Sequence, residues 1–433
     1  MDYRKVYQKK LKKMEDALQL ICSGDTVILG GACNAPSEFG KKLHTQAERL
    51  RGVTVHKDHD HYYDFVRQAG MAEHIRTSGF FFSKDLMEGM SFGNTSFYPT
   101  DLCNYASFIR HKGELDVFVV AATTMDEQGN FQIGLCNMWE GDTLEYALEC
   151  GAKIIVEVNP NLPRVTGGTL INVVNVTCCV EVDTPLPQIP VAVPDDDELK
   201  VAQNVRSLMK DGDCVQFGIG SLPDAIAAQC MDLRDLGLHT EMLTTALGKM
   251  IREGVITGER KNINRGEHLF TFAMGDEALY RTLEQNSACR NVKGSYGVNP
   301  MVICKNDNMV SVNTLIEMDL TGQICSESIG TKQYSGSGGG FDFAYGAMMS
   351  KGGRGIMAFT SKTKKGYSKI KPILTPGAVI TVPRNYADYI VTEYGIAPMR
   401  GRTVRERVNN LIAVAHPDVR EELRAAARKL LYI

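Results

Sequence analysis

The sequence predicts an α/β fold with two similar open-sheet domains in one chain. Apolar runs of strand length alternate with amphipathic helical segments, which is typical of mainly parallel or mixed open sheets. A repeat is the second observation. A Gly-Asp turn, a short apolar strand and a glycine-rich loop occur at residues 24–31 and again at residues 212–220, so the copies lie 188 residues apart (212 − 24). The repeat favours a duplicated domain over two unrelated α/β segments.

Further strands are predicted at Val53–His56, Val117–Ala122, Lys153–Val158 and residues 379–382, because each is a short apolar run between helical segments. Amphipathic helices are predicted before each glycine loop and over residues 417–431. Ligands of open parallel sheets bind beyond the carboxyl ends of the strands. The glycine loops that follow the strands are therefore the expected sites.

A proline-rich stretch separates the two halves. Prolines at 185, 187, 190 and 194 precede an acidic run that begins at Asp195 and suits the first turn of a helix. We expect an N-terminal domain over residues 1–184, a linker over 185–198 and a C-terminal domain over 199–433.

The composition argues against several classes of protein. The 48 Lys and Arg residues against 51 Asp and Glu give a net charge of −3, so the chain has no overall basic field to attract nucleic acid. No apolar run approaches the roughly 18–20 residues that a membrane span needs. The first residues are charged and lack the apolar stretch of a signal peptide. We expect a cytoplasmic protein without nucleic-acid or membrane partners.

Two polar patterns are weaker candidates. Residues 89–93 match the Gly-x-Ser-x-Gly elbow of serine hydrolases around Ser91, but a helical segment rather than a strand precedes them. His56, His59 and His61 alternate with aspartates and could bind a metal or line a substrate pocket. A polar surface or the lining of a substrate pocket is favoured over a metal site. The twelve cysteines form no Cys-x-x-Cys pair and are expected to be buried thiols.

The loop over residues 218–224, with the sequence Gly-Ile-Gly-Ser-Leu-Pro-Asp, is the strongest candidate site. Its two glycines let the backbone approach a ligand, and the amides that enter the next helix can hold an anion or a developing oxyanion. Pro223 stands where a dinucleotide-binding loop needs its third glycine, which argues against NAD. A tight strand-to-helix turn without a ligand is the alternative.

Glu241 follows Gly218 by 23 residues (241 − 218), a spacing of one helix and one strand. The spacing can place the carboxylate at the end of the neighbouring strand, beside the glycine loop. A carboxylate that faces backbone donors is a nucleophile next to an oxyanion hole. A surface glutamate is the alternative.

Residues 335–340, Ser-Gly-Ser-Gly-Gly-Gly, are the most glycine-dense segment. Such density indicates the close approach of a bulky ligand or of another backbone. Lys362, Lys364 and Lys365 could neutralise phosphates, although a solvated loop is the favoured interpretation.

Three ordered motifs, at residues 218–225, 239–242 (His-Thr-Glu-Met) and 328–343, resemble the acetyl-CoA hydrolase/transferase family. The resemblance is strongest to its 4-hydroxybutyrate and butyrate CoA-transferases and extends over nearly the whole chain, including residues 23–25 and 391–397. It implies a CoA-transferase fold duplicated in one chain and Glu241 as the catalytic residue. It also implies CoA contacts at Gly218, Ile219, Gly220, Ser221, Leu222, Ile316, Gly338 and Gly339.

The resemblance also implies that no cofactor and no metal is needed and that the protein is a homo-oligomer, commonly a dimer. An acyl-CoA and a small carboxylate are the expected substrates. With a reference pKa near 4.3, Glu241 is expected to be ionised at neutral pH and to attack the thioester, so that a glutamyl-CoA thioester forms in a ping-pong sequence. Hydrolysis of acyl-CoA by the same glutamate is the alternative. Gln216, Asn299 and Asn34 are expected to line the oxyanion or substrate pocket.

The acceptor side departs from the family pattern. Relatives carry Phe-His-Glu after a Phe-x-Pro element, whereas residues 97–99 are followed here by Thr100-Asp101-Leu102. Relatives also have Asn where this chain has Val298, with Asn299 adjacent. Acetyl-, butyryl- and 4-hydroxybutyryl-CoA are the expected donors. A larger or dicarboxylic acid, such as itaconate or succinate, is the alternative acceptor.

Overall fold

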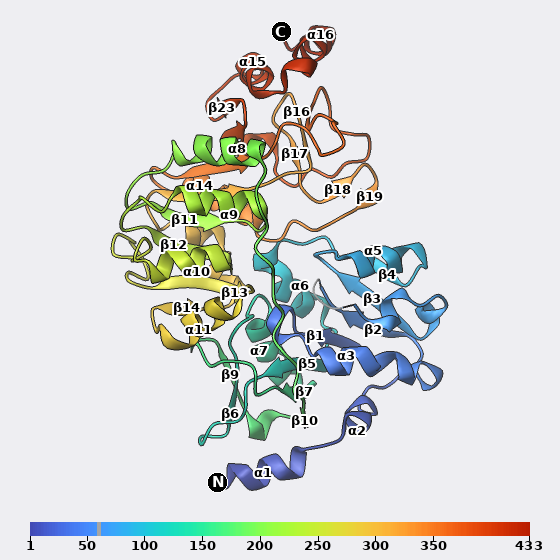
Figure 1. The fold of residues 1–433 in the computed structure, drawn as a ribbon. Helices are drawn as coiled ribbons and strands as arrows, with labels where there is room; N and C mark the ends of the chain where they lie inside the picture. The colour runs from blue at the N-terminus through green and yellow to red at the C-terminus, as the bar shows by residue number, and fades with distance from the viewer. Residues whose placement is uncertain (59–61) are drawn as a thin grey trace. The chain divides into compact units, whose positions relative to one another are not determined.

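The chain divides into two units in the computed structural model, which describes residues 1–58 and 62–433 (Figure 1). Unit 1 contains residues 1–189 and 270–297, and unit 2 contains residues 190–269 and 298–433. The chain therefore leaves unit 1 near the proline-rich stretch, returns to it for residues 270–297 and then completes unit 2. No shift in composition marks this return in the sequence.

A seven-stranded parallel sheet forms the centre of unit 1. Its order is β10 (Cys178–Glu181), β7 (Lys153–Val158), β5 (Val117–Ala122), β1 (Thr26–Leu29), β2 (Val53–His56), β3 (Ile75–Gly79) and β4 (Thr95–Phe97). Every residue of β5 is buried, as expected of a central parallel strand that is covered on both faces. The helices of unit 1 are α1 (Tyr3–Lys10), α2 (Met14–Leu18), α3 (Ser37–Leu43), α4 (Asp64–Arg67), α5 (Lys84–Ser91), α6 (Tyr105–Lys112), α7 (Glu140–Cys150), α11 (Glu277–Gln285) and α12 (Gly294–Gly297).

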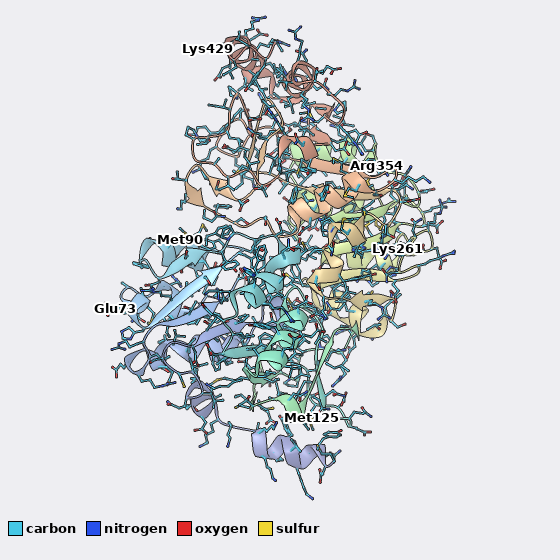
Figure 2. All side chains as sticks on the ribbon, turned by 180° about the vertical axis from the view of Figure 1, so that it is seen from behind. Glu73, Met90, Met125, Lys261, Arg354 and Lys429 are labelled. Atoms are coloured by element: carbon cyan, nitrogen blue, oxygen red, sulfur yellow. The ribbon has the colours of Figure 1, made fainter. Side chains whose placement is uncertain are left out.

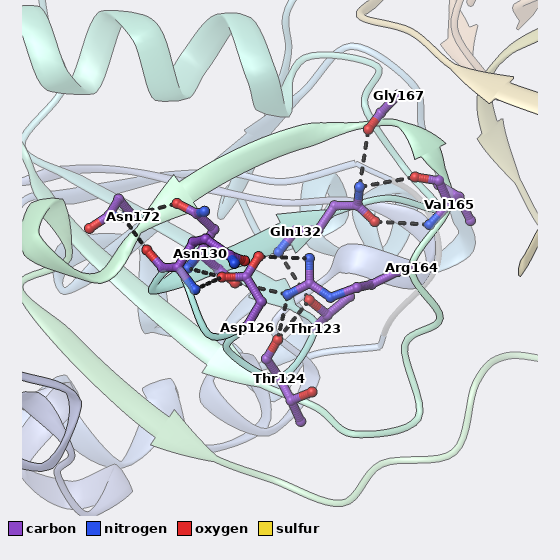
Figure 3. Close-up of polar contacts among 10 residues, drawn as sticks. Thr123, Thr124, Asp126, Asn130, Gln132, Arg164, Val165, Gly167 and Asn172 are labelled. Carbon is purple, nitrogen blue, oxygen red and sulfur yellow. Dashed lines mark hydrogen bonds and ion pairs between the residues drawn. The ribbon is translucent and has the colours of Figure 1, made fainter. Parts of the chain in front are cut away.

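Two short strand pairs complete unit 1: β6 (Asn130–Ile133) with β9 (Thr169–Asn172), and β8 (Thr166–Gly167) with β14 (Cys289–Asn291). The Gln132 amide nitrogen donates to the carbonyl oxygens of Val165 and Gly167, both at 3.0 Å (Figure 3). Arg164 donates to the carbonyl oxygens of Thr124 and Asn130. These two side chains satisfy backbone carbonyl groups in and around β6 and β8, and their hydrogen bonds join the two segments.

Unit 2 contains the strand order β23 (Gly395–Pro398), β22 (Tyr389–Thr392), β20 (Arg354–Ala358), β15 (Met309–Asn313), β11 (Cys214–Phe217) and β12 (Gly237–Leu243), parallel except for β23. Strand β13 (His268–Ala273) spans the boundary between the units. The helices are α8 (Asp196–Arg206), α9 (Ser221–Gln229), α10 (Thr245–Arg252), α13 (Pro300–Ile303), α14 (Gly340–Met349), α15 (Val404–Val414) and α16 (Arg420–Lys429). Smaller sheets join β16 (Glu317–Asp319), β17 (Ile324–Cys325) and β21 (Ile370–Lys371), and β18 (Ser328–Ile329) with β19 (Lys332–Gln333).

An ion pair joins the amino ends of two unit 2 strands, β20 and β11. Arg354, which is labelled in Figure 2, is the first residue of β20. It forms an ion pair with the buried carboxylate of Asp213, which immediately precedes β11. These two charges neutralise each other and stabilise this edge of the sheet. The opposite, carboxyl edge carries the glycine loop.

The predicted repeat is confirmed at the level of elements. In each unit a turn with a left-handed glycine, Gly24 (φ +86°) or Gly212 (φ +80°), leads into a buried strand, a glycine loop and a helix. Asp195 caps α8 in a capping box, so the acidic run does begin a helix. The strand predicted at 379–382 is wrong: only Val382 forms a bridge, with Ile324, because Pro376 and Pro383 limit regular pairing on either side.

Within the described residues, every helix is too short or too polar to cross a bilayer.

Candidate active site

The glycine loop of unit 2 follows β11 directly, as predicted. Ile219 is 58% exposed at the tip, and Gly220 has φ +110°, a conformation that favours glycine. A Cβ on Gly218 would lie no closer than 3.6 Å to any neighbouring atom. The loop thus presents open backbone to solvent just before α9.

Glu241 lies on the strand beside this loop. In the parallel pairing of β11 and β12, Val215 is opposite Leu238. Gly218 and Glu241 each follow that pair by three residues (218 − 215 and 241 − 238), so they lie level on neighbouring strands. Glu241 therefore lies on the strand next to the one that leads into the loop, as predicted, and β12 continues past it to Leu243 instead of ending there. The proximity of its carboxylate to the loop stays a prediction.

The glycine-dense segment meets the same carboxylate. The Gly339 backbone N–H donates a hydrogen bond to Glu241 Oε2 at 2.9 Å. A Cβ on Gly339 would stand 2.5 Å from that oxygen, so a side chain at this position would have to displace the Glu241 carboxylate. Gly339 caps α14, and the positive end of this helix therefore faces the carboxylate. The close approach at Gly339 is thus made by the Glu241 side chain and not by another backbone, and the approach of a bulky ligand stays a prediction.

Burial raises the pKa of the Glu241 carboxyl to about 7, while the Gly339 N–H acts in the opposite direction. The expectation that Glu241 is fully ionised at neutral pH is therefore wrong, because the reference value ignores desolvation. A glutamate with this pKa exchanges between an acid and a partly desolvated carboxylate near pH 7. The carboxylate form is the nucleophile.

The other predicted CoA contacts in unit 2 have defined places. Ser221 begins α9 and donates through Oγ to Glu198 on α8 at 2.6 Å, and Leu222 is buried. Gly338 is in the left-handed region at φ +50°. Ile316 lies between β15 and β16, and its N–H donates to the Cys325 carbonyl.

Two of the three expected pocket residues also lie in unit 2. Gln216 and Asn313 exchange amide hydrogen bonds at 3.2 and 3.3 Å across β11 and β15, close to the glycine loop. Asn299 caps α13 by accepting the Met301 N–H at 2.9 Å. Asn313 is thus a neighbour of Gln216 that the sequence analysis did not identify, because the pair joins strands that are far apart along the chain.

Asn34 lies in unit 1 and is fully buried after β1. Its amide nitrogen donates to the Ala121 carbonyl, and its Oδ1 accepts the Cys136 N–H, both at 2.7 Å. These two bonds join the loop after β1 to β5 and to the segment before α7. Its expected role in a substrate pocket stays a prediction.

The two weaker candidates from the sequence are the Gly-x-Ser-x-Gly pattern around Ser91 and the histidines at 56, 59 and 61. Ser91 is the last residue of α5 and donates to the Glu88 carbonyl, so the strand and turn of a nucleophile elbow are not formed there. His56 is buried, its Nδ1 lies 2.6 Å from Ser78 Oγ, and burial lowers the pKa of its imidazole to about 4. His59 and His61 lie outside the described residues. Within the described ranges, no group of three or more His, Cys, Asp or Glu side chains could hold a metal.

Most of the cysteines are buried thiols, as expected, with Cys22 and Cys150 exposed. Burial raises the pKa of the Cys214 thiol to about 11, which makes it a poor nucleophile at neutral pH.

Comparison with protein families identifies both parts of the chain. Residues 1–202 match the acetyl-CoA hydrolase/transferase N-terminal domain, and residues 275–427 match the C-terminal domain of the same name. The chain is 34% identical to the succinyl-CoA:cyclohexane-1-carboxylate CoA transferase of Geobacter metallireducens, over 99% of this chain and 97% of that protein. It is 35% identical to the 4-hydroxybutyrate coenzyme A transferase of Clostridium kluyveri, over 98% of each chain.

A solved structure shares the fold over the full length. The crystal structure of RipA from Yersinia pestis superposes with a TM-score of 0.91 at 33% identity and covers 100% of both chains.

Proposed function

Because the chain belongs to the acetyl-CoA hydrolase/transferase family, we propose that it is an acyl-CoA:carboxylate CoA-transferase whose nucleophile is Glu241. The observation that carries the proposal is the placement of this carboxylate. It lies level with the open glycine loop on the next strand and is held by the N-terminus of α14. Relatives that match over the full length are named transferases, which favours transfer over hydrolysis.

The reaction proceeds in two symmetrical halves. A Glu241 carboxylate oxygen attacks the thioester carbonyl, the carbon–sulfur bond breaks, and an acyl-glutamyl anhydride and CoA thiolate form. The thiolate then attacks the glutamyl carbonyl, releases the donor acid as its carboxylate and leaves a glutamyl-CoA thioester. The acceptor carboxylate attacks that thioester, and the returning thiolate takes the new acyl group from the second anhydride. Glu241 ends as a carboxylate.

Backbone donors supply the stabilisation that a weak nucleophile needs. Each tetrahedral intermediate carries a negative oxygen, and N–H groups of the glycine loop and of Gly339 are the proposed donors. CoA is proposed to contact residues 218–222, Ile316, Gly338 and Gly339. The CoA tail then supplies binding energy away from the reacting carbon. The glutamate and the two substrates provide all the reacting groups, so the mechanism requires no cofactor.

The acceptor is proposed to be a small carboxylate. Relatives named for 4-hydroxybutyrate and for succinyl-CoA place both a short hydroxy acid and a dicarboxylic donor within the family. Turnover should be compared with acetate, butyrate, 4-hydroxybutyrate, succinate and itaconate as acceptors. A preference for acetate and butyrate would support this proposal, and a preference for succinate or itaconate would support the larger or dicarboxylic alternative instead. A cytoplasmic location and a homo-oligomeric state complete the proposal.

Oxygen labelling distinguishes transfer from hydrolysis. With acetate labelled in both oxygens as acceptor, one labelled oxygen passes to Glu241 and, in the next turnover, into the released donor acid. Transfer therefore predicts label in that acid and conserved total thioester. Oxygen from labelled water in the acid, with free CoA accumulating, would contradict transfer and support hydrolysis.

A further inference from the structure

His239 and Glu241 share one face of β12, because residues two apart along a strand point to the same side. His239 is completely buried. It belongs to the same short motif as Glu241, yet the proposed chemistry gives it no role. A buried imidazole needs a defined hydrogen-bonding partner.

Asn306 supplies that partner. Its Nδ2 lies 3.3 Å from His239 Nδ1, and Asn306 is itself completely buried. Asn306 Oδ1 accepts the Ile263 N–H at 3.3 Å, which fixes the orientation of the amide and turns Nδ2 toward the histidine. Asn306 Nδ2 is thereby placed to donate to His239 Nδ1.

The His239 ring supports the first turn of α14. It meets the Phe343 ring edge to face, with centroids 6.3 Å apart and planes at 77°. Phe343 in turn packs against Gly339: a Cβ on Gly339 would lie 3.4 Å from Phe343 Cδ2, and the Phe343 N–H donates to the Gly339 carbonyl at 2.9 Å. A continuous chain of contacts therefore runs from Asn306 through His239 and Phe343 to the amide that holds Glu241.

We propose that His239 is a positioning residue. It fixes the position of the α14 N-terminus relative to β12, so that the Gly339 N–H reaches Glu241 Oε2. The Asn306 bond fixes the orientation of the ring, and the ring fixes Phe343 and the turn above it. The importance of this positioning for catalysis rests on the proposed function, because the position of the Gly339 N–H affects the reaction only if Glu241 is the nucleophile. The structural claim concerns the Gly339–Glu241 bond alone and can be measured without any substrate.

The test is the titration of Glu241 in the absence of acyl-CoA. Protein labelled with ¹³C at the glutamate carboxyl carbons is followed by NMR, and Glu241→Gln identifies the resonance. His239→Ala lets the first turn of α14 move away, so Glu241 loses a donor that stabilises its charged form. We expect its pKa to rise by about one unit. His268→Ala, which removes another buried histidine of unit 2, is the matched control and should leave the Glu241 titration unchanged.

A folded His239→Ala protein with an unaltered Glu241 titration would overturn the proposal, as would an equal rise in His268→Ala. If His239→Ala does not fold, Asn306→Leu decides, because it removes the anchoring bond and leaves the ring in place. A smaller rise in the same direction supports the proposal, and no rise overturns it. Loss of the proposed function would appear separately, as the absence of acyl transfer by a wild-type protein whose Glu241 still titrates near 7.

Discussion

Glu241 Oε2 and the backbone N–H of Gly339 are joined by a 2.9 Å hydrogen bond across 98 residues of sequence. The bond places the positive end of α14 at the carboxylate, and the missing side chain of Gly339 makes room for it. The contact links the two most distinctive patterns of the C-terminal half, the His-Thr-Glu-Met motif and the glycine-dense segment.

Gly339→Ala should lower kcat strongly, by roughly 100-fold, because its Cβ would meet Glu241 Oε2 at 2.5 Å and displace the carboxylate. The backbone of Gly339, at φ −89° and ψ 10°, accepts alanine, so the effect is on the glutamate and not on chain strain. Steady-state kinetics measure the effect. Gly340→Ala is the matched control: no atom lies within 4 Å of its Cβ position, and kcat should stay within about twofold of wild type. Equal losses in both variants would refute this steric account.

The first half-reaction should accelerate with rising pH. Only the ionised form of Glu241 attacks, and its pKa is about 7, so the rate of donor-acid release should rise about tenfold per pH unit below pH 6 and level off above pH 8. Rapid-mixing measurement of donor-acid release in a single turnover, without an acceptor acid, avoids effects of later steps. A rate that stays constant between pH 5 and 8 would show that Glu241 is ionised throughout.

The free energy of unfolding should also depend on pH through the raised pKa of Glu241. The Glu241 carboxyl has a pKa near 4.5 when unfolded and about 7 when folded, so the folded state binds the extra proton and stability falls as pH rises between these values. Glu241→Gln removes this loss. We expect the variant to be more stable than wild type by about 1–3 kcal/mol at pH 8, and by far less at pH 4.5. Denaturant melts at the two pH values measure the difference, and a gain that is independent of pH would point to packing instead.

The two glycines of the β11 loop should respond differently to alanine. Gly220 has φ +110°, so Gly220→Ala should cost about 1–3 kcal/mol of stability through backbone strain. Gly218→Ala fits without a close contact and should fold like wild type, but its methyl group projects where CoA is proposed to lie, so the KM for acyl-CoA should rise about tenfold or more. Melting curves and kinetics of the two variants separate these effects. Normal KM values in Gly218→Ala would place CoA elsewhere.

Local patterns predicted the parts of the site that depend on neighbouring elements. The strand, glycine loop and helix around Gly218 follow from residue types, and the placement of Glu241 on the next strand follows from a spacing of one helix and one strand. The Gly339 contact joins distant segments, so glycine density could indicate a close approach without identifying the partner. The raised pKa of Glu241 depends on desolvation by the folded chain, which no sequence motif encodes.

The segment of residues 270–297 shows the same limit at the level of domains. It packs with unit 1 although it lies inside the C-terminal half of the sequence. Its strands and helices are ordinary α/β elements, and nothing in their composition distinguishes one unit from the other.

Covalent capture of Glu241 tests the central claim most directly. The protein is incubated with acetyl-CoA, treated with borohydride, which reduces a thioester and leaves a free carboxylate intact, and digested for peptide mass spectrometry. Conversion of a glutamyl-CoA thioester to an alcohol lowers the mass of Glu241 by about 14 units, and we predict this loss only when acyl-CoA is present. An unmodified Glu241 in a protein that still transfers CoA would contradict the account.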